Sequence, residues 1–279
     1  MARRWLAIAA GIPAALLLFA IFIIIFTPAA TLQGVVDRAF EGAGFTFRAA
    51  EFGKALPLGF KARNLELADE RGVLFRADDA VVRLRLLPLL AGKVSLGYRA
   101  GVGNGYIRGV LSPLPGGEFQ VEISHLRLED IPFFLTATGT RVKGDLRGEG
   151  NFRGSGENAR GEAQLEVKGV DLTGVKIGGL PLPDASYDTV RGALKVSKGK
   201  AVLESATLQG EGLYVRLKGD LPVTTPLGEA PLNLTLELMP KPAFLERQKF
   251  VFLLLGKYLV SPGNYRIPIH GTLGRPAIQ

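Results

Sequence analysis

Residues 77–98 read ADDAVVRLRLLPLLAGKVSLGY. Within this stretch Val82, Leu84 and Leu86 alternate with arginines, which predicts a strand with one dry face and one solvated face. Pro88 cannot donate a hydrogen bond to a neighbouring strand, so it ends this one. The leucines and the glycine that follow predict a short apolar corner, after which the chain enters a second strand. Such a unit buries a single face of a sheet.

The rest of the chain repeats this one-sided pattern, as the alternating runs 213–218 and 232–238 illustrate. Glycine or proline separates the runs at short intervals, which is typical of antiparallel meanders. The 36 glycines among 279 residues also suit a protein that is rich in turns and bulges. We expect ten apolar residues to line one continuous face of the sheet: Val82, Leu84, Leu86, Leu194, Val196, Leu213, Val215, Leu217, Leu234 and Leu236.

The N-terminal segment predicts a membrane anchor. Residues 5–27 carry no charge, and this length suffices for a bilayer core, which takes about 20 apolar residues. Arg3 and Arg4 precede the span, so the positive-inside rule places the N-terminus in the cytoplasm. A cleaved signal peptide is disfavoured because its apolar region runs only about 7–15 residues. We predict a cytoplasmic tip at 1–4, a transmembrane helix at 5–27, and a β domain outside the cytoplasm at 28–279.

Two further segments have helical spacing. The first, 32–40, predicts a short amphipathic helix that caps the open end of the sheet. The second, 242–259, begins with a proline, which suits the first turn of a helix. This helix either packs on the sheet or docks on a membrane surface or a partner. Its candidate docking residues are Phe244, Val251, Leu255 and Tyr258.

The predicted fold class is mainly β. It comprises one long curved antiparallel sheet folded into a groove, with an N-terminal transmembrane helix and one or two short capping helices. A sheet with one apolar face must cover that face. Either the sheet folds over itself, or a lipid or a partner occupies the groove. An exposed apolar stripe of several hundred Å² normally marks a binding surface.

The net charge of +8 raises the question of nucleic-acid binding. The basic residues are spread singly along the strands, however, and no aromatic platform typical of RNA-binding motifs accompanies them. Attraction to anionic lipid headgroups is a better use of this charge. Residues 101–105, GVGNG, superficially resemble a dinucleotide-binding loop. A strand pattern follows them rather than a helix, so we predict a hairpin turn and no cofactor.

Catalytic motifs are not evident. The sequence contains no cysteine, and its two histidines, His125 and His270, are far apart. It offers no thiolate or paired-histidine metal site and no Gly-x-Ser-x-Gly motif. His125 shares the alternation of Val121 and Ile123, and we interpret it as a strand-end histidine. No two acidic residues stand out as an acid and base pair. We therefore predict a non-enzymatic protein without catalytic residues, cofactor or metal site.

The predicted anchor, the capping helix and the stretch 77–96, ADDAVVRLRLLPLLAGKVSL, together resemble the opening of AsmA-like proteins. The ending 263–276, GNYRIPIHGTLGRP, is similar to the close of type II secretion system protein N. AsmA-like proteins are usually far longer, so the size favours the protein N family, and one anchor with one β domain fits the whole chain. The resemblance implies a single-pass protein of the bacterial inner membrane whose C-terminal domain lies in the periplasm. It supplies no catalytic residues.

Two functions are therefore open. The first is a non-enzymatic scaffold or docking protein of a type II secretion system, with other envelope proteins of that system as partners. The second is an AsmA-like groove protein that binds or transfers phospholipid. The two are compatible, because a groove can be the architecture of a scaffold.

Overall fold

The computed structural model describes residues 28–114, 116–154, 156–177, 180–181, 184–198, 200–222, 231–272 and 275–278. The predicted cytoplasmic tip at 1–4 and transmembrane helix at 5–27 lie outside these residues. Within the described part, none of the helices combines the length and the apolar character that a membrane crossing requires.

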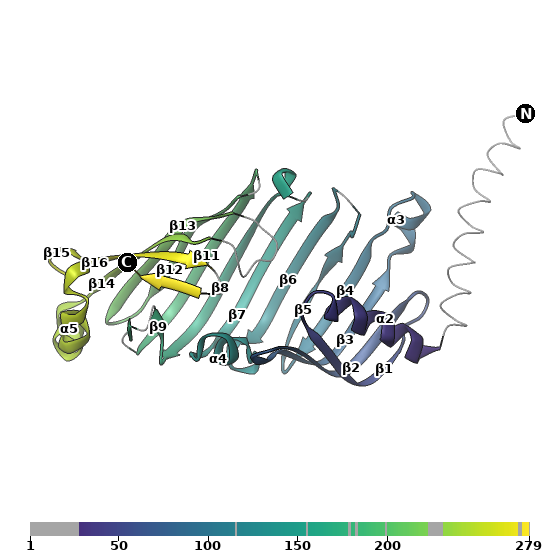
Figure 1. The fold of residues 1–279 in the computed structure, drawn as a ribbon, viewed down its shortest axis with the longest axis horizontal. Coiled ribbons are helices and arrows are strands. Elements are labelled where there is room, and N and C mark those ends of the chain that lie inside the picture. Colours follow the sequence, from purple (N-terminus) through teal and green to yellow (C-terminus); the bar gives the residue numbers. More distant parts are fainter. Residues whose placement is uncertain are drawn as a thin grey trace, which may run out of the picture.

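The described residues are mainly β and form one 15-stranded antiparallel sheet, beside which lies the separate pair β9–β10 (Figure 1). The order along the sheet is β1-β2-β3-β4-β5-β6-β7-β8-β11-β12-β13-β14-β16-β15, and β17 also pairs with β16. The sheet is open, with β1 and β15 at its two ends. The strands are β1 (Thr46–Lys54), β2 (Gly59–Asp69), β3 (Gly72–Leu84), β4 (Leu96–Val102), β5 (Gly105–Leu111), β6 (Glu118–Arg127), β7 (Arg141–Arg153), β8 (Arg160–Thr173), β9 (Lys176–Ile177), β10 (Leu180–Pro181), β11 (Ala185–Ser197), β12 (Lys200–Gln209), β13 (Leu213–Pro222), β14 (Asn233–Pro240), β15 (Leu259–Ser261), β16 (Asn264–Thr272) and β17 (Arg275–Ile278).

Most strands pair with the next strand in the chain, so the sheet is largely a meander of hairpins. Between β4 and β5 the turn consists of Gly103 and Asn104, and Gly103 has a φ of +54°. Glycine adopts this left-handed conformation without a steric penalty. The hairpin predicted for 101–105 is therefore confirmed. One exception to the simple order is that β8 pairs directly with β11, because β9 and β10 pair with each other outside the main sheet.

Short helices accompany the sheet: α2 (Ala29–Glu41), α3 (Leu86–Leu90), α4 (Phe133–Thr138), α5 (Pro242–Arg247) and α6 (Lys249–Leu254), with the 3-10 turns η1 (Leu128–Asp130), η2 (Gly156–Asn158) and η4 (Gly256–Tyr258). The helix α2 confirms the one predicted around 32–40. It packs against β1, where the rings of Phe40 and Phe47 stack with their centroids 5.4 Å apart. Because β1 is the end strand, α2 lies at that end of the sheet (Figure 1).

The corner after β3 differs from the prediction. The strand ends at Leu84, and Leu86 is the first residue of the helix α3 rather than a strand residue. Pro88 falls in the first turn of this helix, where the backbone N–H groups have no partner within the helix. Its missing donor therefore costs the helix nothing, and the apolar run turns into a helix earlier than the alternation indicates.

The helix predicted for 242–259 is divided into α5, α6 and η4. Gln248, between α5 and α6, has φ −108° and ψ 26°, which departs from the helical values. The predicted helix is therefore interrupted at this residue, and α6 begins directly after it.

Candidate binding face of the sheet

Strand register brings the apolar residues of the alternating runs to one face of the sheet. A single row of cross-strand partners passes from β3 to β16 without leaving this face. The row consists of Val82, Tyr98, Gly109, Val121, Gly150, Ala163, Leu194, Leu203, Gly219, Leu234 and Ile269. We call this side of the sheet the apolar face.

The residues predicted to line one face can now be placed. Leu86 is the exception, because it belongs to α3. By strand register the other nine share the apolar face: Val82, Leu84, Leu194, Val196, Leu213, Val215, Leu217, Leu234 and Leu236. They come from both halves of the chain, and the sheet itself connects them.

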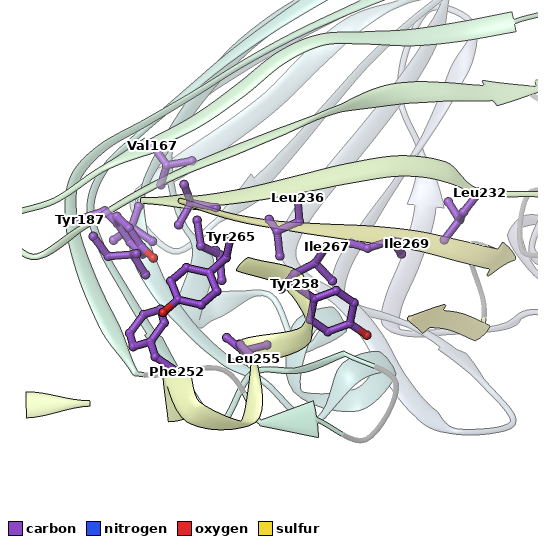
Figure 2. Packing of buried hydrophobic residues seen from close by; sticks show 14 of the residues in the cluster. Val167, Tyr187, Leu232, Leu236, Phe252, Leu255, Tyr258, Tyr265, Ile267 and Ile269 are labelled. Carbon is purple, nitrogen blue, oxygen red and sulfur yellow. The ribbon is translucent and has the colours of Figure 1, made fainter. Parts of the chain in front are cut away.

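The C-terminal half of the apolar face is covered by the chain's own helical segment. Phe252 of α6 and the adjoining Leu255 are 3% and 0% exposed. The ring of Phe252 lies 5.1 Å from the ring of Tyr265 in β16, measured between centroids. Figure 2 shows Phe252, Leu255 and Tyr258 lying against Tyr265 and Ile267. This half of the face is therefore a packed hydrophobic core.

The packing leaves a cavity of about 220 Å³ beside this core. The side chains that line it are apolar except for that of Tyr187, which carries a hydroxyl group. Burial disfavours the phenolate and raises the pKa of Tyr187 to about 12, so this group is neutral at physiological pH. Four of the predicted lining residues contribute to the wall, which comprises Leu172, Val175, Tyr187, Ala206, Leu208, Leu213, Val215, Leu217, Leu236 and Leu238.

The middle of the apolar face is less covered. Leu111, Phe119 and Leu165 are 39%, 38% and 45% exposed, which is high for large apolar side chains in a sheet. Phe119 stacks between two aromatic rings, with centroids 6.2 Å from Tyr98 and 6.1 Å from Phe152. These three side chains lie on β5, β6 and β8, and we call this part of the face the exposed strip. Through Gly192, Leu165 is connected to Ala206 in β12, at the covered half.

Glycines beneath this strip explain its shape. A Cβ atom at Gly192 would lie 3.0 Å from the side chain of Leu165, and one at Gly150 would lie 3.0 Å from the ring of Phe152. The side chains of Leu165 and Phe152 therefore cover neighbouring glycines on the same face. The strip is a shallow surface made of a small number of large apolar side chains. Apolar contact over such a surface is non-directional. It suits chain-like apolar ligands better than ligands that need precise hydrogen bonds.

The opposite face of the sheet carries charged side chains that pair across neighbouring strands. The Nη2 atom of Arg108 lies 2.7 Å from Oε1 of Glu122, and Nε of Arg191 lies 3.1 Å from Oε1 of Glu166. The hydrogen bond from Arg108 lowers the pKa of Glu122 below its usual value. Such exposed pairs contribute little stability. Among the described residues, no group of three or more His, Asp or Glu side chains could hold a metal ion.

We predicted that His125 lies at a strand end, but it lies within β6, two residues before the strand ends. It has a φ of +50° at a bulge, where the register between β6 and β7 shifts. The extra residue turns His125 to the solvent, where its Nδ1 atom lies 3.2 Å from the carboxylate of Asp145. Leu126 takes the apolar face instead and is 1% exposed. An inserted residue of this kind reverses the alternation without any signature in the pattern itself.

The prediction that Phe244, Val251, Leu255 and Tyr258 form a docking surface is also wrong. Leu255 and Tyr258 are buried, and Phe244 and Val251 pack against the same hydrophobic cluster. Helical spacing identified the apolar side of the segment that faces the sheet, so these residues form no docking surface. Phe250, Leu253 and Leu254 form a second, exposed apolar side of the segment, and none of them was among the predicted docking residues.

Comparison of this chain with protein-family models, with curated proteins and with solved structures finds no match.

Proposed function

We propose that this protein is a non-enzymatic, membrane-anchored component of the bacterial cell envelope that holds the acyl chains of phospholipids along its apolar face. The proposal includes the finer features predicted from the sequence. These are a transmembrane helix at 5–27, a periplasmic location of 28–279, and a sheet that curves into a groove.

One observation carries the proposal. Leu165 of the exposed strip is connected by cross-strand pairing, through Gly192, to Ala206 in the wall of the apolar cavity of about 220 Å³. An acyl chain bound from the exposed strip to the cavity would replace water over the strip and in the cavity. Each buried CH₂ group would contribute about 0.8 kcal/mol. Since the wall offers only one hydroxyl group, the ligand's polar headgroup would stay outside the cavity, in solvent.

The test is native mass spectrometry of the full chain released from detergent micelles. We expect a phospholipid to accompany the wild-type protein. Ala206→Phe places a ring in the cavity and keeps the face apolar, so it should displace the lipid. The matched control is Ala193→Phe, in the neighbouring strand on the opposite face of the sheet. It should retain the lipid. A lipid-free wild type, or equal lipid in the two variants, would overturn the proposal.

The second candidate function is a docking protein of a type II secretion system, working beside other envelope proteins of that system. It is supported by the resemblance carried by 77–96 and 263–276, and by the exposed Phe119, which an apolar segment of a partner would cover. The test is secretion of a type II substrate in the native host. A strain without this chain should lose secretion, and wild type should restore it. Restoration by Phe119→Glu at the wild-type level would remove the apolar strip as the docking site.

A further inference from the structure

A second apolar surface lies at the end of the sheet that is opposite α2. It consists of Phe250, Leu253 and Leu254 on α6 with Leu259 and Val260 on β15, and we call these five residues the tip patch. Phe250 and Leu253 are 76% and 70% exposed. The helix explains why they group together, because residues three and four positions apart share a helix face. Phe252 and Leu255 occupy the other side and face the core.

The surroundings of the tip patch are basic. Arg247, Lys249 and Lys257 are exposed within the segment 242–261, and Glu246 is its single acidic residue. The Nζ atom of Lys257 lies 4.7 Å from the centroid of the Tyr258 ring, and Tyr258 directly precedes the patch residue Leu259. The tip therefore combines protruding leucine, valine and phenylalanine side chains with flanking cations.

We propose that the tip patch inserts into the headgroup region of a bilayer that contains anionic phospholipid. A short amphipathic helix binds a membrane interface by burying its apolar side chains, while its cations attract anionic headgroups. The five side chains of the patch contain no hydrogen-bonding group, Lys249 adjoins Phe250 in the sequence, and Lys257 lies two residues before Leu259. The apolar side chains match the acyl interior of a bilayer, and the cations match its anionic headgroups. The proposal is separate from lipid binding on the apolar face, because the tip patch points away from that face.

The position of the patch has a geometric consequence. The path from β1 to β15 contains 14 strands, and neighbouring strands lie about 4.8 Å apart. The two ends of the sheet are thus separated by roughly 60 Å along the sheet. The tip patch lies at one end and α2 at the other (Figure 1). Contact with a bilayer at the tip is therefore distinct from any contact made by the segment that precedes α2.

The experiment uses the full chain, which has no cysteine of its own. Leu253→Cys is labelled with nitrobenzoxadiazole and reconstituted in vesicles of phosphatidylcholine and phosphatidylglycerol. Brominated phosphatidylcholine, which quenches the label only on contact, is added either to the same vesicles or to a second population. Quenching in the first arm means that the tip patch contacts the membrane in which the protein is reconstituted. Quenching in the second arm means that the tip patch contacts a separate membrane. Either result supports the proposal.

The matched control is Leu135→Cys on α4, which replaces a leucine that is 56% exposed near the middle of the sheet. Its label should show no quenching in either arm. Lys249→Glu combined with Lys257→Glu should reduce quenching at position 253, because both changes repel anionic headgroups. Absence of quenching at 253 in both arms, or equal quenching at 135, would overturn the proposal. A blue-shifted label that brominated lipid does not quench would also overturn it, by indicating that protein covers the patch.

Discussion

The hydroxyl group of Tyr98 in β4 donates a hydrogen bond to the main-chain carbonyl oxygen of Gln120 in β6, with 2.9 Å between the two oxygen atoms. The bond crosses the intervening strand β5 above Gly109, where a Cβ atom would lie 2.6 Å from the Tyr98 hydroxyl. Three strands are thereby tied together on the apolar face by one side chain. Burial raises the pKa of Tyr98, which keeps the hydroxyl available as a donor.

Gly109→Ala should destabilise the sheet because the added methyl group would collide with the carbonyl oxygen of Gln120 as well as with Tyr98. Tyr98→Phe removes only the hydrogen bond and should cost about 0.5–1.5 kcal/mol. Urea unfolding in detergent, followed by circular dichroism, measures both. Gly97→Ala is the control, since its Cβ would meet nothing closer than 3.9 Å. Equal stabilities of Gly109→Ala and Gly97→Ala would contradict the tight crossing.

Leu255→Ala and Leu253→Ala make a matched pair, because the same residue type is changed two positions apart. Leu255 is fully buried under the helical segment, whereas Leu253 belongs to the tip patch. We expect Leu255→Ala to cost about 2–5 kcal/mol through lost burial and a new cavity. Leu253→Ala should change the free energy of unfolding by less than about 0.5 kcal/mol. Similar costs for the two variants would show that the two sides of α6 have been assigned wrongly.

Glu237 in β14 is a buried carboxylate on the charged face, with Nζ of Lys218 at 3.1 Å and Nη2 of Arg266 at 3.5 Å from its Oε1 atom. Glu237→Gln keeps the shape but removes the charge, and should cost about 1–3 kcal/mol. The control is Glu166→Gln, whose partner Arg191 is largely exposed, with an expected cost below about 1 kcal/mol. Chemical denaturation at neutral pH compares them, and a larger effect at Glu166 would refute the ranking.

Acid should weaken the fold partly through Glu118. Arg153 donates a hydrogen bond to this carboxylate, with 2.9 Å between Nη2 and Oε1, and Gln120 donates another. Together they lower the pKa of Glu118 from its usual 4.5. A group whose pKa is lower in the folded state stabilises that state above the unfolded pKa. This contribution is lost as the pH falls from 4.5 through the lowered folded value.

The midpoint of urea unfolding at pH 7 and pH 3 tests this linkage. Glu118→Gln and Arg153→Ala should each lose less stability on acidification than the wild type, because the ion pair is already absent. An unchanged acid dependence in both variants would show that other carboxylates carry it.

The sequence alone determined that the chain is mainly β, with an antiparallel sheet, and which strand residues share the apolar face. Alternation with period two assigns every residue of a strand to one of two faces, so runs such as 213–218 could be placed before any strand was paired. The turn at 101–105 followed from glycine chemistry in the same local way. The helix around 32–40 was also local, since its spacing and its terminal glycines occur within a single segment.

Only the tertiary structure decided where the alternation of apolar and polar residues breaks down, and which residues pack against each side of the sheet and of α6. The bulge at His125 reverses the alternation because one inserted residue shifts the register, which depends on the neighbouring strand β7. Adjacent helix residues point in different directions, and packing against β16 places Phe252 in the core while Leu253 stays in solvent. The cavity beside Tyr187 arises where side chains of five strands fail to fill the space between them. Such volumes depend on contacts between residues far apart in the sequence, which no local pattern contains.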